Sequence, residues 1–415
     1  MDWKPPPRPE WVENLIAHGD AVGGSAGLLP LDPDALIARA RASTGLDDFG
    51  PDEHWRPHFE IYLEALEREA ALHLAGRIVS GMEILRTLRN RLLLTELWKR
   101  RPEILETPVE APVFVVGSAR SGTSITHELF DRDSANRTPL LWEMLHPAEA
   151  GEGADLSAVG DRSMLFWHQL QPEYETMHAN SGFLPNECIY IFMHSFLSDQ
   201  FAGCHVVPSY SRHLHGVDKR MVYEEHRRIL QTLEPGPDSA RWILKAPSHL
   251  SQLRSLFAVY PDARIVLTHR DPLQFLGSNL NLLGTLKWMR SNEVDLARWI
   301  EILPKGQAAL WRDVIDARAC GELPDDQFVD VRYADLMADP AATLAAVYEA
   351  LGWDCSSEVR NAMASYIRHK PRGSRGRHSY SLEQFGLDRD AERERFSFYT
   401  ERFQIPTEAA DEAGA

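Results

Sequence analysis

The chain has 415 residues, of which 44% are hydrophobic and 25% are charged, a composition typical of a globular protein with room for two folding units. Its formal net charge of −17 argues against a nucleic-acid-binding protein, because such proteins usually present a basic surface. The four cysteines form no C-x-x-C pair, so we expect neither a disulfide framework nor a zinc site. The sequence has neither a signal-peptide pattern nor an apolar run of the roughly 18 residues that span a bilayer, so we expect a cytoplasmic protein.

The N-terminal quarter predicts a helical unit. Residues 1 to about 30 are rich in Pro, Gly and Ala and predict an irregular arm. The pattern from residue 32 to about 102 is helical, with apolar side chains such as Phe59, Leu63 and Leu66 on one face. Several prolines then interrupt the pattern. We therefore predict an N-terminal arm and helical subdomain in residues 1–110, followed by an α/β domain in residues 111–415.

The stretch PVFVVGSARSGTSITHELF, residues 112–130, predicts a strand, a turn of small residues and a helix. Its apolar run at 113–116 is continuous, which is typical of a strand buried on both faces of a parallel sheet. The helix is expected to begin near Ser124. Backbone amides in such a turn and the positive end of the helix dipole favour an anion, so we predict an anion-binding loop.

This loop resembles a Walker A sequence but lacks its lysine. Gly117 and Gly122 have the G-x4-G spacing, whereas Thr123 stands where an ATPase or kinase has Lys. The positive charge is instead Arg120, inside the turn. The substitution weakens an ordinary NTPase or kinase interpretation. A turn that merely joins the strand to the helix remains the structural alternative.

Residues 166 to about 210 form a loop-rich region in which Trp, Tyr, Phe, Met and His are frequent. Such side chains are typical of a small-molecule pocket, although a loosely packed edge of the core would look similar. His178 lies in this region. His213 and His215 follow in an apparent polar loop and have no acidic or cysteine partner at metal-ligand spacing, so we interpret them as surface histidines.

Three further strands are predicted at residues 241–245, 264–268 and 328–333, separated by helical patterns. This alternation predicts parallel neighbours, and ligands of parallel sheets bind beyond the carboxyl ends of the strands. The polar residues expected at that edge are Arg120, Lys245, His249, Arg270 and Tyr333. A basic segment at 368–377 is interpreted as a loop over a bound anion, or alternatively as a flexible tail.

Residues 112–124, taken with RIVLTHRDP at 264–272 and Ser278, resemble the PAPS-dependent sulfotransferases, in particular the bacterial group with a helical N-terminal extension. The resemblance implies an α/β fold with a P-loop-like parallel sheet flanked by helices. It also implies 3′-phosphoadenylyl sulfate (PAPS) as the sulfuryl donor and a hydroxyl group of a small molecule as the acceptor. The chemistry requires no metal, and no nucleic-acid partner is implied.

The family's site residues can be transferred to matching positions of this sequence. Its phosphosulfate loop corresponds to Arg120, Ser121, Gly122, Thr123 and Ser124. An Arg and a Ser eight residues later, which bind the 3′-phosphate, correspond to Arg270 and Ser278. The tyrosine near the adenine corresponds to Tyr333, and a closing basic loop corresponds to Arg375, Gly376 and Arg377.

The general base is open between two histidines. The family's catalytic His directly follows a Lys at the end of the second strand; here Lys245 matches, but His249 comes four residues later. His178 is the rival. Arg120 and Lys245 are expected to stabilise transition-state charge. The aromatic region favours a hydrophobic acceptor, and a P-loop kinase or a non-catalytic nucleotide-binding protein remains the alternative.

Overall fold

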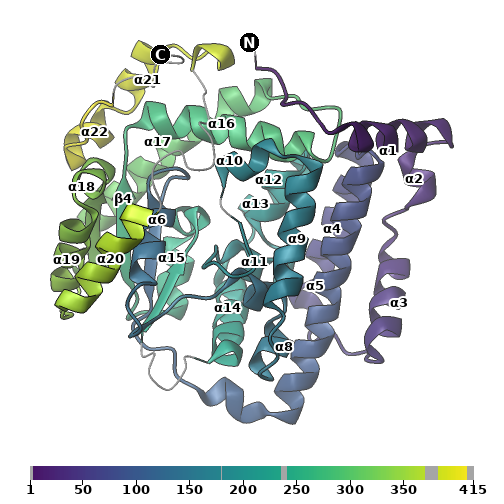
Figure 1. The fold of residues 1–415 in the computed structure, drawn as a ribbon, viewed down its shortest axis with the longest axis horizontal. Coiled ribbons are helices and arrows are strands. Elements are labelled where there is room, and N and C mark those ends of the chain that lie inside the picture. Colours follow the sequence, from purple (N-terminus) through teal and green to yellow (C-terminus); the bar gives the residue numbers. More distant parts are fainter. Residues whose placement is uncertain (1–2, 179, 235–240, 370–381, 409–415) are drawn as a thin grey trace.

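A five-stranded parallel sheet forms the centre of the computed structural model, which describes residues 3–178, 180–234, 241–369 and 382–408 (Figure 1). Its strand order is β2-β3-β1-β4-β5. The strands are β1 (Val113–Gly117), β2 (Asn136–Arg137), β3 (Arg241–Lys245), β4 (Arg264–His269) and β5 (Phe328–Arg332). Every pairing between neighbours is parallel, which confirms the α/β fold expected from the sequence.

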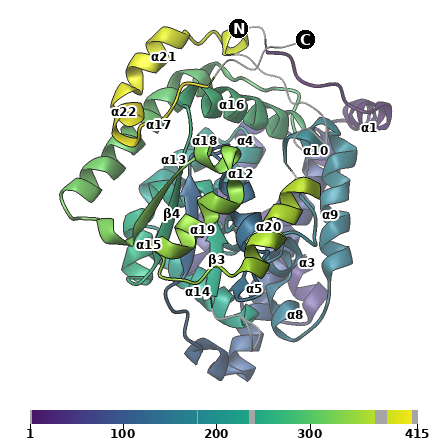
Figure 2. The same cartoon turned by 60° about the vertical axis from the view of Figure 1, so that its left-hand side comes forward.

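Both faces of β1 are buried, which explains its unbroken apolar run. Val113 and Val115 face one hydrophobic cluster, while Phe114 and Val116 face another. Helices α6 (Thr123–Phe130), α19 (Pro340–Ala350) and α20 (Ser357–His369) contribute to the first cluster, and α19 and α20 stand in front of the sheet in Figure 2. Helices α14 (Arg220–Leu233) and α15 (Leu253–Val259) contribute to the second.

The N-terminal quarter is helical, but the expectation of an irregular arm up to residue 30 was wrong. Its helices are α1 (Glu10–Ala21), α2 (Ser25–Leu28), α3 (Pro33–Thr44), α4 (Arg56–Glu69) and α5 (Leu74–Arg100), on the right of Figure 1. In α1, Val12, Ile16 and Gly19 share a buried face, and Glu10 and Glu13 favour the positive end of the helix dipole. The prolines of residues 1–30, and all of the glycines there except Gly19, lie outside this helix.

Residues 3–9 are extended and contact α16 (Pro272–Trp288). The indole nitrogen of Trp3 donates to Asn281 at 2.7 Å, and the Arg8 guanidinium lies 3.5 Å from the centre of a Trp288 ring. Arg8 also donates to the Trp288 carbonyl. The N-terminal segment is therefore attached to the helix that follows β4.

Short helices, rather than loops, fill much of the region from residue 166 to 210. They are the end of α9 (Ser157–Leu170), α10 (Glu173–Met177), α11 (Ile189–Phe192), α12 (Asp199–Cys204) and the start of α13 (Pro208–Gly216). The prediction of a polar loop around His213 and His215 was wrong, because both lie in α13. The His213 ring contacts His58 of α4 at 2.8 Å, and His215 is exposed.

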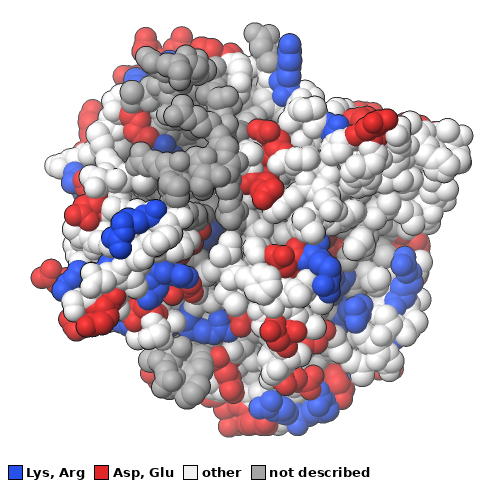
Figure 3. Space-filling view, in the orientation of Figure 1, with Lys and Arg blue, Asp and Glu red and all other residues white. Residues whose placement is uncertain are grey.

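Acidic and basic side chains are intermixed on the face shown in Figure 3. Within the described residues, every helix is too short or too polar to traverse a bilayer. Most of the basic segment at 368–377, including Arg375, Gly376 and Arg377, lies outside the described residues.

Candidate functional site

A cavity of about 340 Å³ opens at the carboxyl ends of β1, β3 and β4. One end is formed by the loop between β1 and α6, together with Arg270 and Tyr333. The other end is formed by residues of 174–190, the start of α12, and the middle of α16. The cavity therefore lies at the edge of the sheet where the sequence predicted a ligand.

The loop between β1 and α6 has an unusual backbone. Arg120 has φ +72° and Gly122 has φ +100°, both in the left-handed region. Gly122 precedes the first residue of α6, and no side chain caps that helix, so its first amide groups are available to an anion. A Cβ atom at Gly122 would lie 2.8 Å from the Tyr333 ring, so the loop and Tyr333 touch.

Arg120 connects three parts of the site. Its Nε donates to the Ser278 hydroxyl at 3.0 Å, and its Nη1 donates to the carbonyl of Met177 at 2.7 Å. Its own carbonyl accepts a hydrogen bond from Arg270 Nη1 at 2.9 Å. Arg120 is thus brought together with Ser278 and Arg270, which lie 158 and 150 residues later in the sequence.

Arg270 lies at the same end of the cavity as the loop between β1 and α6. Its guanidinium carbon is 4.0 Å from the centre of the Tyr333 ring, a cation–π contact. The same guanidinium forms a forked ion pair with Glu408, with Nε–Oε1 at 2.9 Å and Nη2–Oε2 at 2.8 Å. Glu408 was not anticipated from the sequence.

The five loop residues differ in where their side chains point. Arg120, Gly122, Thr123 and Ser124 line the cavity. Ser121 is buried, its hydroxyl pairs with the Thr268 hydroxyl of β4 at 2.7 Å, and its amide donates to the Ser118 carbonyl at 3.1 Å, so it supports the loop from behind. Thr123, which replaces the Walker lysine, is the first residue of α6 and is buried.

Lys245, at the end of β3, forms a buried ion pair with Glu187. The Nζ atom lies 2.8 Å from Glu187 Oε1 and 3.3 Å from the Ser124 hydroxyl, so Lys245 connects Glu187 to the loop between β1 and α6. His178 Nε2 approaches the same Glu187 oxygen at 3.6 Å. Burial alone would raise the pKa of the Glu187 carboxyl, but Lys245 and His178 outweigh this effect and hold the pKa well below its usual value.

The position of Glu187 is set by contacts that a sequence pattern does not reveal. The amide of Cys188 donates to the carbonyl of Lys245 at 2.8 Å, which fixes this segment against the end of β3. The Asn186 Oδ1 atom accepts a hydrogen bond from the Glu187 amide at 2.8 Å, and the Nδ2 atom of the same side chain donates to Asn180 Oδ1 at the same distance. Sequence reasoning marked the surrounding aromatic region as a pocket but did not identify Glu187.

His249 does not line the cavity. It belongs to a 3-10 turn, Pro247–Ser251, that directs its ring into the core, where the side chain is fully buried. Its Nδ1 bonds the Tyr223 hydroxyl at 2.6 Å, and the ring packs edge-on against Phe114. Burial, reinforced by His226, lowers the pKa of this imidazole well below its usual value. We therefore do not retain His249 as a candidate base, whereas His178 does line the cavity.

At the end of the cavity away from the loop between β1 and α6, an apolar wall faces polar residues that include Asn180, Asp199 and Gln200. Leu282 and Leu283 of α16 are half-buried there, and Leu286 is buried one turn farther along the helix. Ile189 and Tyr190 of α11 complete this wall. An apolar wall next to Glu187 suits a ligand with a hydrophobic body and one polar group.

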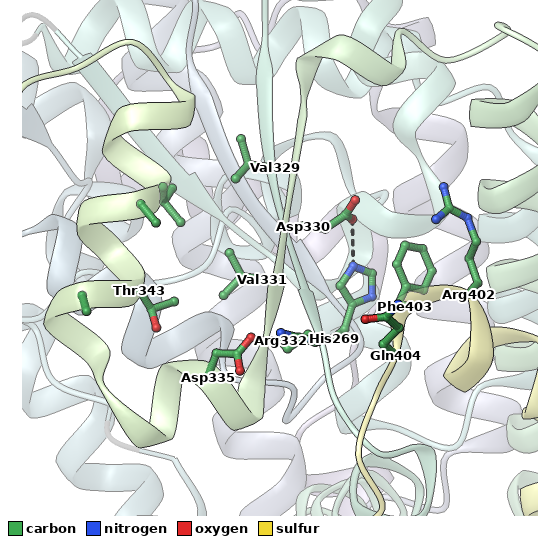
Figure 4. A pocket seen from close by; sticks show the side chains of 13 residues that line it. His269, Val329, Asp330, Val331, Arg332, Asp335, Thr343, Arg402, Phe403 and Gln404 are labelled. Atoms are coloured by element: carbon green, nitrogen blue, oxygen red, sulfur yellow. Dashed lines mark hydrogen bonds and ion pairs between the residues drawn. The ribbon is translucent and has the colours of Figure 1, made fainter.

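A second cavity, of about 640 Å³, lies beside β5, α19 and the end of α22 (Ser397–Phe403). Figure 4 shows Asp330 directed at His269, and the Oδ1–Nε2 distance is 2.8 Å. Asp330 also accepts two hydrogen bonds from Arg318. Because these charges neutralise one another, we assign no chemistry to this cavity. Across the described residues, no cluster of His, Cys, Asp and Glu has the arrangement of a metal site.

Comparison with known proteins identifies the family. The sequence matches the model described as "Sulfotransferase family" over residues 112–357. It is 24% identical over 294 residues to the omega-hydroxy-beta-dihydromenaquinone-9 sulfotransferase Stf3 of Mycobacterium bovis, which covers 64% of this chain and 70% of the relative.

Two solved structures are also similar. Sulfotransferase STF1 from Mycobacterium tuberculosis H37Rv has a TM-score of 0.76 and 31% identity, covering 88% of this chain and 98% of that chain. Sulfotransferase STF9 from Mycobacterium avium has a TM-score of 0.77 and 25% identity, covering 91% of this chain and 98% of that chain. The family model matches more than half of this chain, and the chain therefore belongs to the sulfotransferase family.

Proposed function

We propose that the protein transfers the sulfuryl group of PAPS to a hydroxyl group of a small hydrophobic acceptor. The observation that carries this proposal is the cavity itself, which Arg120 and Arg270 line beside an uncapped helix N-terminus and an apolar wall. Lys245 lies behind this helix N-terminus, in contact with the cavity-lining Ser124. The name of the relative Stf3 specifies a menaquinone derivative as its substrate, and this supports a hydrophobic acceptor for this chain.

The loop between β1 and α6, residues 118–122, and the first residues of α6 are here called the donor loop; together with Arg270 they would bind the anionic nucleotide. The first amides of α6 and the Arg120 side chain would hold the 5′-phosphosulfate. Arg270 and Ser278, already joined through Arg120, would hold the 3′-phosphate, and Tyr333 would pack against the adenine. Arg375, Gly376 and Arg377 remain proposed members of a closing loop, on family resemblance alone. When bound, PAPS supplies the sulfuryl group and the leaving phosphate.

Two cations would stabilise charge during transfer. Sulfuryl transfer resembles phosphoryl transfer in spreading negative charge over the equatorial and leaving oxygens, so positioning and electrostatic stabilisation dominate catalysis. Lys245 already contacts Ser124 of the donor loop, and Arg120 is held across the same loop. In this proposal both side chains turn toward the reacting oxygens when PAPS binds.

Glu187 is the proposed general base. Its carboxylate contacts Lys245 and so lies next to the donor loop, where the acceptor hydroxyl must arrive. In the free protein Lys245 holds the pKa of Glu187 low. If Lys245 turns toward the donor oxygens, this restraint weakens, the pKa rises, and the carboxylate becomes a better proton acceptor.

His178 is the second candidate base, and a specific feature favours it. Its Nε2 faces Glu187, while its buried Nδ1 has no hydrogen-bond partner among the described residues. A neutral ring that donates from Nε2 to Glu187 could accept the proton at Nδ1, with the carboxylate stabilising the resulting cation.

The proposal is tested by retention on immobilised 3′-phosphoadenosine 5′-phosphate (PAP), followed by transfer of labelled sulfate from PAPS to a panel of phenols, long-chain alcohols and sugars. We expect transfer to the hydrophobic acceptors, with a loss of roughly 10² to 10⁴ in kcat for Glu187→Gln and unchanged PAP retention. Binding without transfer to any acceptor would refute the enzymatic role. A larger loss in His178→Gln than in Glu187→Gln would move the base to His178.

A further inference from the structure

We propose that Glu408 is a specificity-determining residue of the donor site, because its carboxylate competes with the nucleotide's 3′-phosphate for Arg270. This inference rests on the proposed function, in which Arg270 binds that phosphate. The carboxylate would lower the affinity for 3′-phosphorylated nucleotides selectively and would ease the release of PAP after transfer.

The contact has the geometry of an anion-binding site that is already filled. Arg270 donates from Nε and Nη2 to the two carboxylate oxygens of Glu408 at 2.9 and 2.8 Å, the fork that also suits two oxygens of a phosphate. The two side chains are only 15% and 25% exposed. Because Nε and Nη2 both donate to Glu408, a phosphate can bind this fork of Arg270 only after the carboxylate leaves.

The chain around Glu408 is held in place, so the contact is not an isolated surface pair. After α22, the backbone turns at Gln404, which has φ +52°, and continues toward the end of β4. Ile405 packs on the hydrophobic core, and Arg393 donates to the Thr407 hydroxyl at 3.1 Å. The Glu408 amide donates to the Asp271 carboxylate at 2.9 Å. These contacts present the carboxylate to Arg270.

Competition of this kind changes affinities in a predictable way. If the carboxylate occupies Arg270 in about nine molecules of ten, the apparent Kd for a ligand that needs Arg270 is about tenfold weaker than the intrinsic Kd. A nucleotide without a 3′-phosphate does not need Arg270 and is not penalised. Glu408 therefore reduces the preference of the site for PAP over 5′-AMP.

The test is calorimetric titration of PAP and 5′-AMP against the full chain and its Glu408→Gln variant at one fixed salt concentration. We expect Glu408→Gln to bind PAP about three- to tenfold more tightly and 5′-AMP with unchanged affinity. Glu401→Gln is the matched control, since Glu401 is exposed in α22 and its substitution removes the same charge. This control should leave both affinities unchanged.

Variants of Arg270 separate the failure of this inference from failure of the proposed function. In an Arg270→Ala background, Glu408→Gln should no longer affect PAP binding. If Arg270→Ala removes the preference for PAP but Glu408→Gln has no effect, weakens PAP, or tightens both nucleotides equally, the competition is refuted while the proposed function stands. If Arg270→Ala leaves the preference unchanged, the 3′-phosphate assignment is refuted, and the competition with it.

Discussion

Replacing Lys245 by Met should destabilise the protein in a way that depends on pH. The substitution leaves the Glu187 carboxylate, 13% exposed, without the ammonium group that lies 2.8 Å away. Breaking a buried ion pair by removing one partner typically costs about 3–5 kcal/mol, because the remaining charge is uncompensated. We expect a loss of this size in the free energy of unfolding near neutral pH.

The sign of the pH dependence follows from Glu187. Its pKa in the folded protein is held below the ordinary value of 4.5, so the unfolded chain binds more protons as the pH falls through that region. The stabilisation from the pair is therefore complete above pH 4.5 and is lost progressively below it. The difference in the free energy of unfolding between wild type and Lys245→Met should therefore become smaller as the pH falls below 4.5.

Urea denaturation of wild type and Lys245→Met, at neutral pH and at about pH 4, measures this difference in the free energy of unfolding. Glu187→Gln in the Lys245→Met background should recover part of the lost stability, because it removes the uncompensated charge. A stability loss that is the same at both pH values, or two substitutions whose effects simply add, would show that the pair does not act as a coupled buried charge pair.

Three further outcomes are expected. In titration calorimetry, Arg270→Ala should weaken PAP binding by roughly thirty-fold or more, because a partly buried charge-assisted contact contributes about 2–5 kcal/mol. Binding of 5′-AMP should be nearly unchanged. An unchanged ratio of the PAP and 5′-AMP affinities would contradict the role of Arg270. His249→Ala should lower the melting temperature but retain most of kcat, since the ring is part of the core; a large kcat loss in a fully stable variant would restore His249 as a base. Gly122→Ala should lose PAP retention because of the Tyr333 contact and the positive φ, and melting curves will show whether the fold persists.

Local patterns were sufficient to predict four of the five strands of the sheet and the turn that follows β1, but not the two-residue strand β2. The run at residues 113–116 and the small residues after it gave the strand, turn and helix almost to the residue, because burial on both faces and a tight turn are local requirements. The same holds for β3 and β4. Arg120, Arg270 and Tyr333 could be placed at one edge because parallel strands end at the same edge.

The residues that the sequence could not place depend on long-range contacts. Glu187 reaches the site because Cys188 pairs with the end of β3, and Glu408 reaches it because the chain returns from α22. The inward turn of His249 depends on one short 3-10 turn and on the aromatic side chains that receive its ring. Helix α1 was missed because the prolines and glycines flanking it dominated the composition of its surroundings.

The hydrogen bonds around Arg120 also bear on how the protein acquires its site during synthesis. Ser278 lies 158 residues after Arg120, Arg270 lies 150 residues after it, and Trp3 meets Asn281 across 278 residues. When the donor loop leaves the ribosome, none of its distant partners has yet been made. Contacts between residues so far apart in the sequence form late, and they make folding slower. The nascent chain therefore carries the loop of Arg120 without its partners Arg270 and Ser278 until α16 is complete.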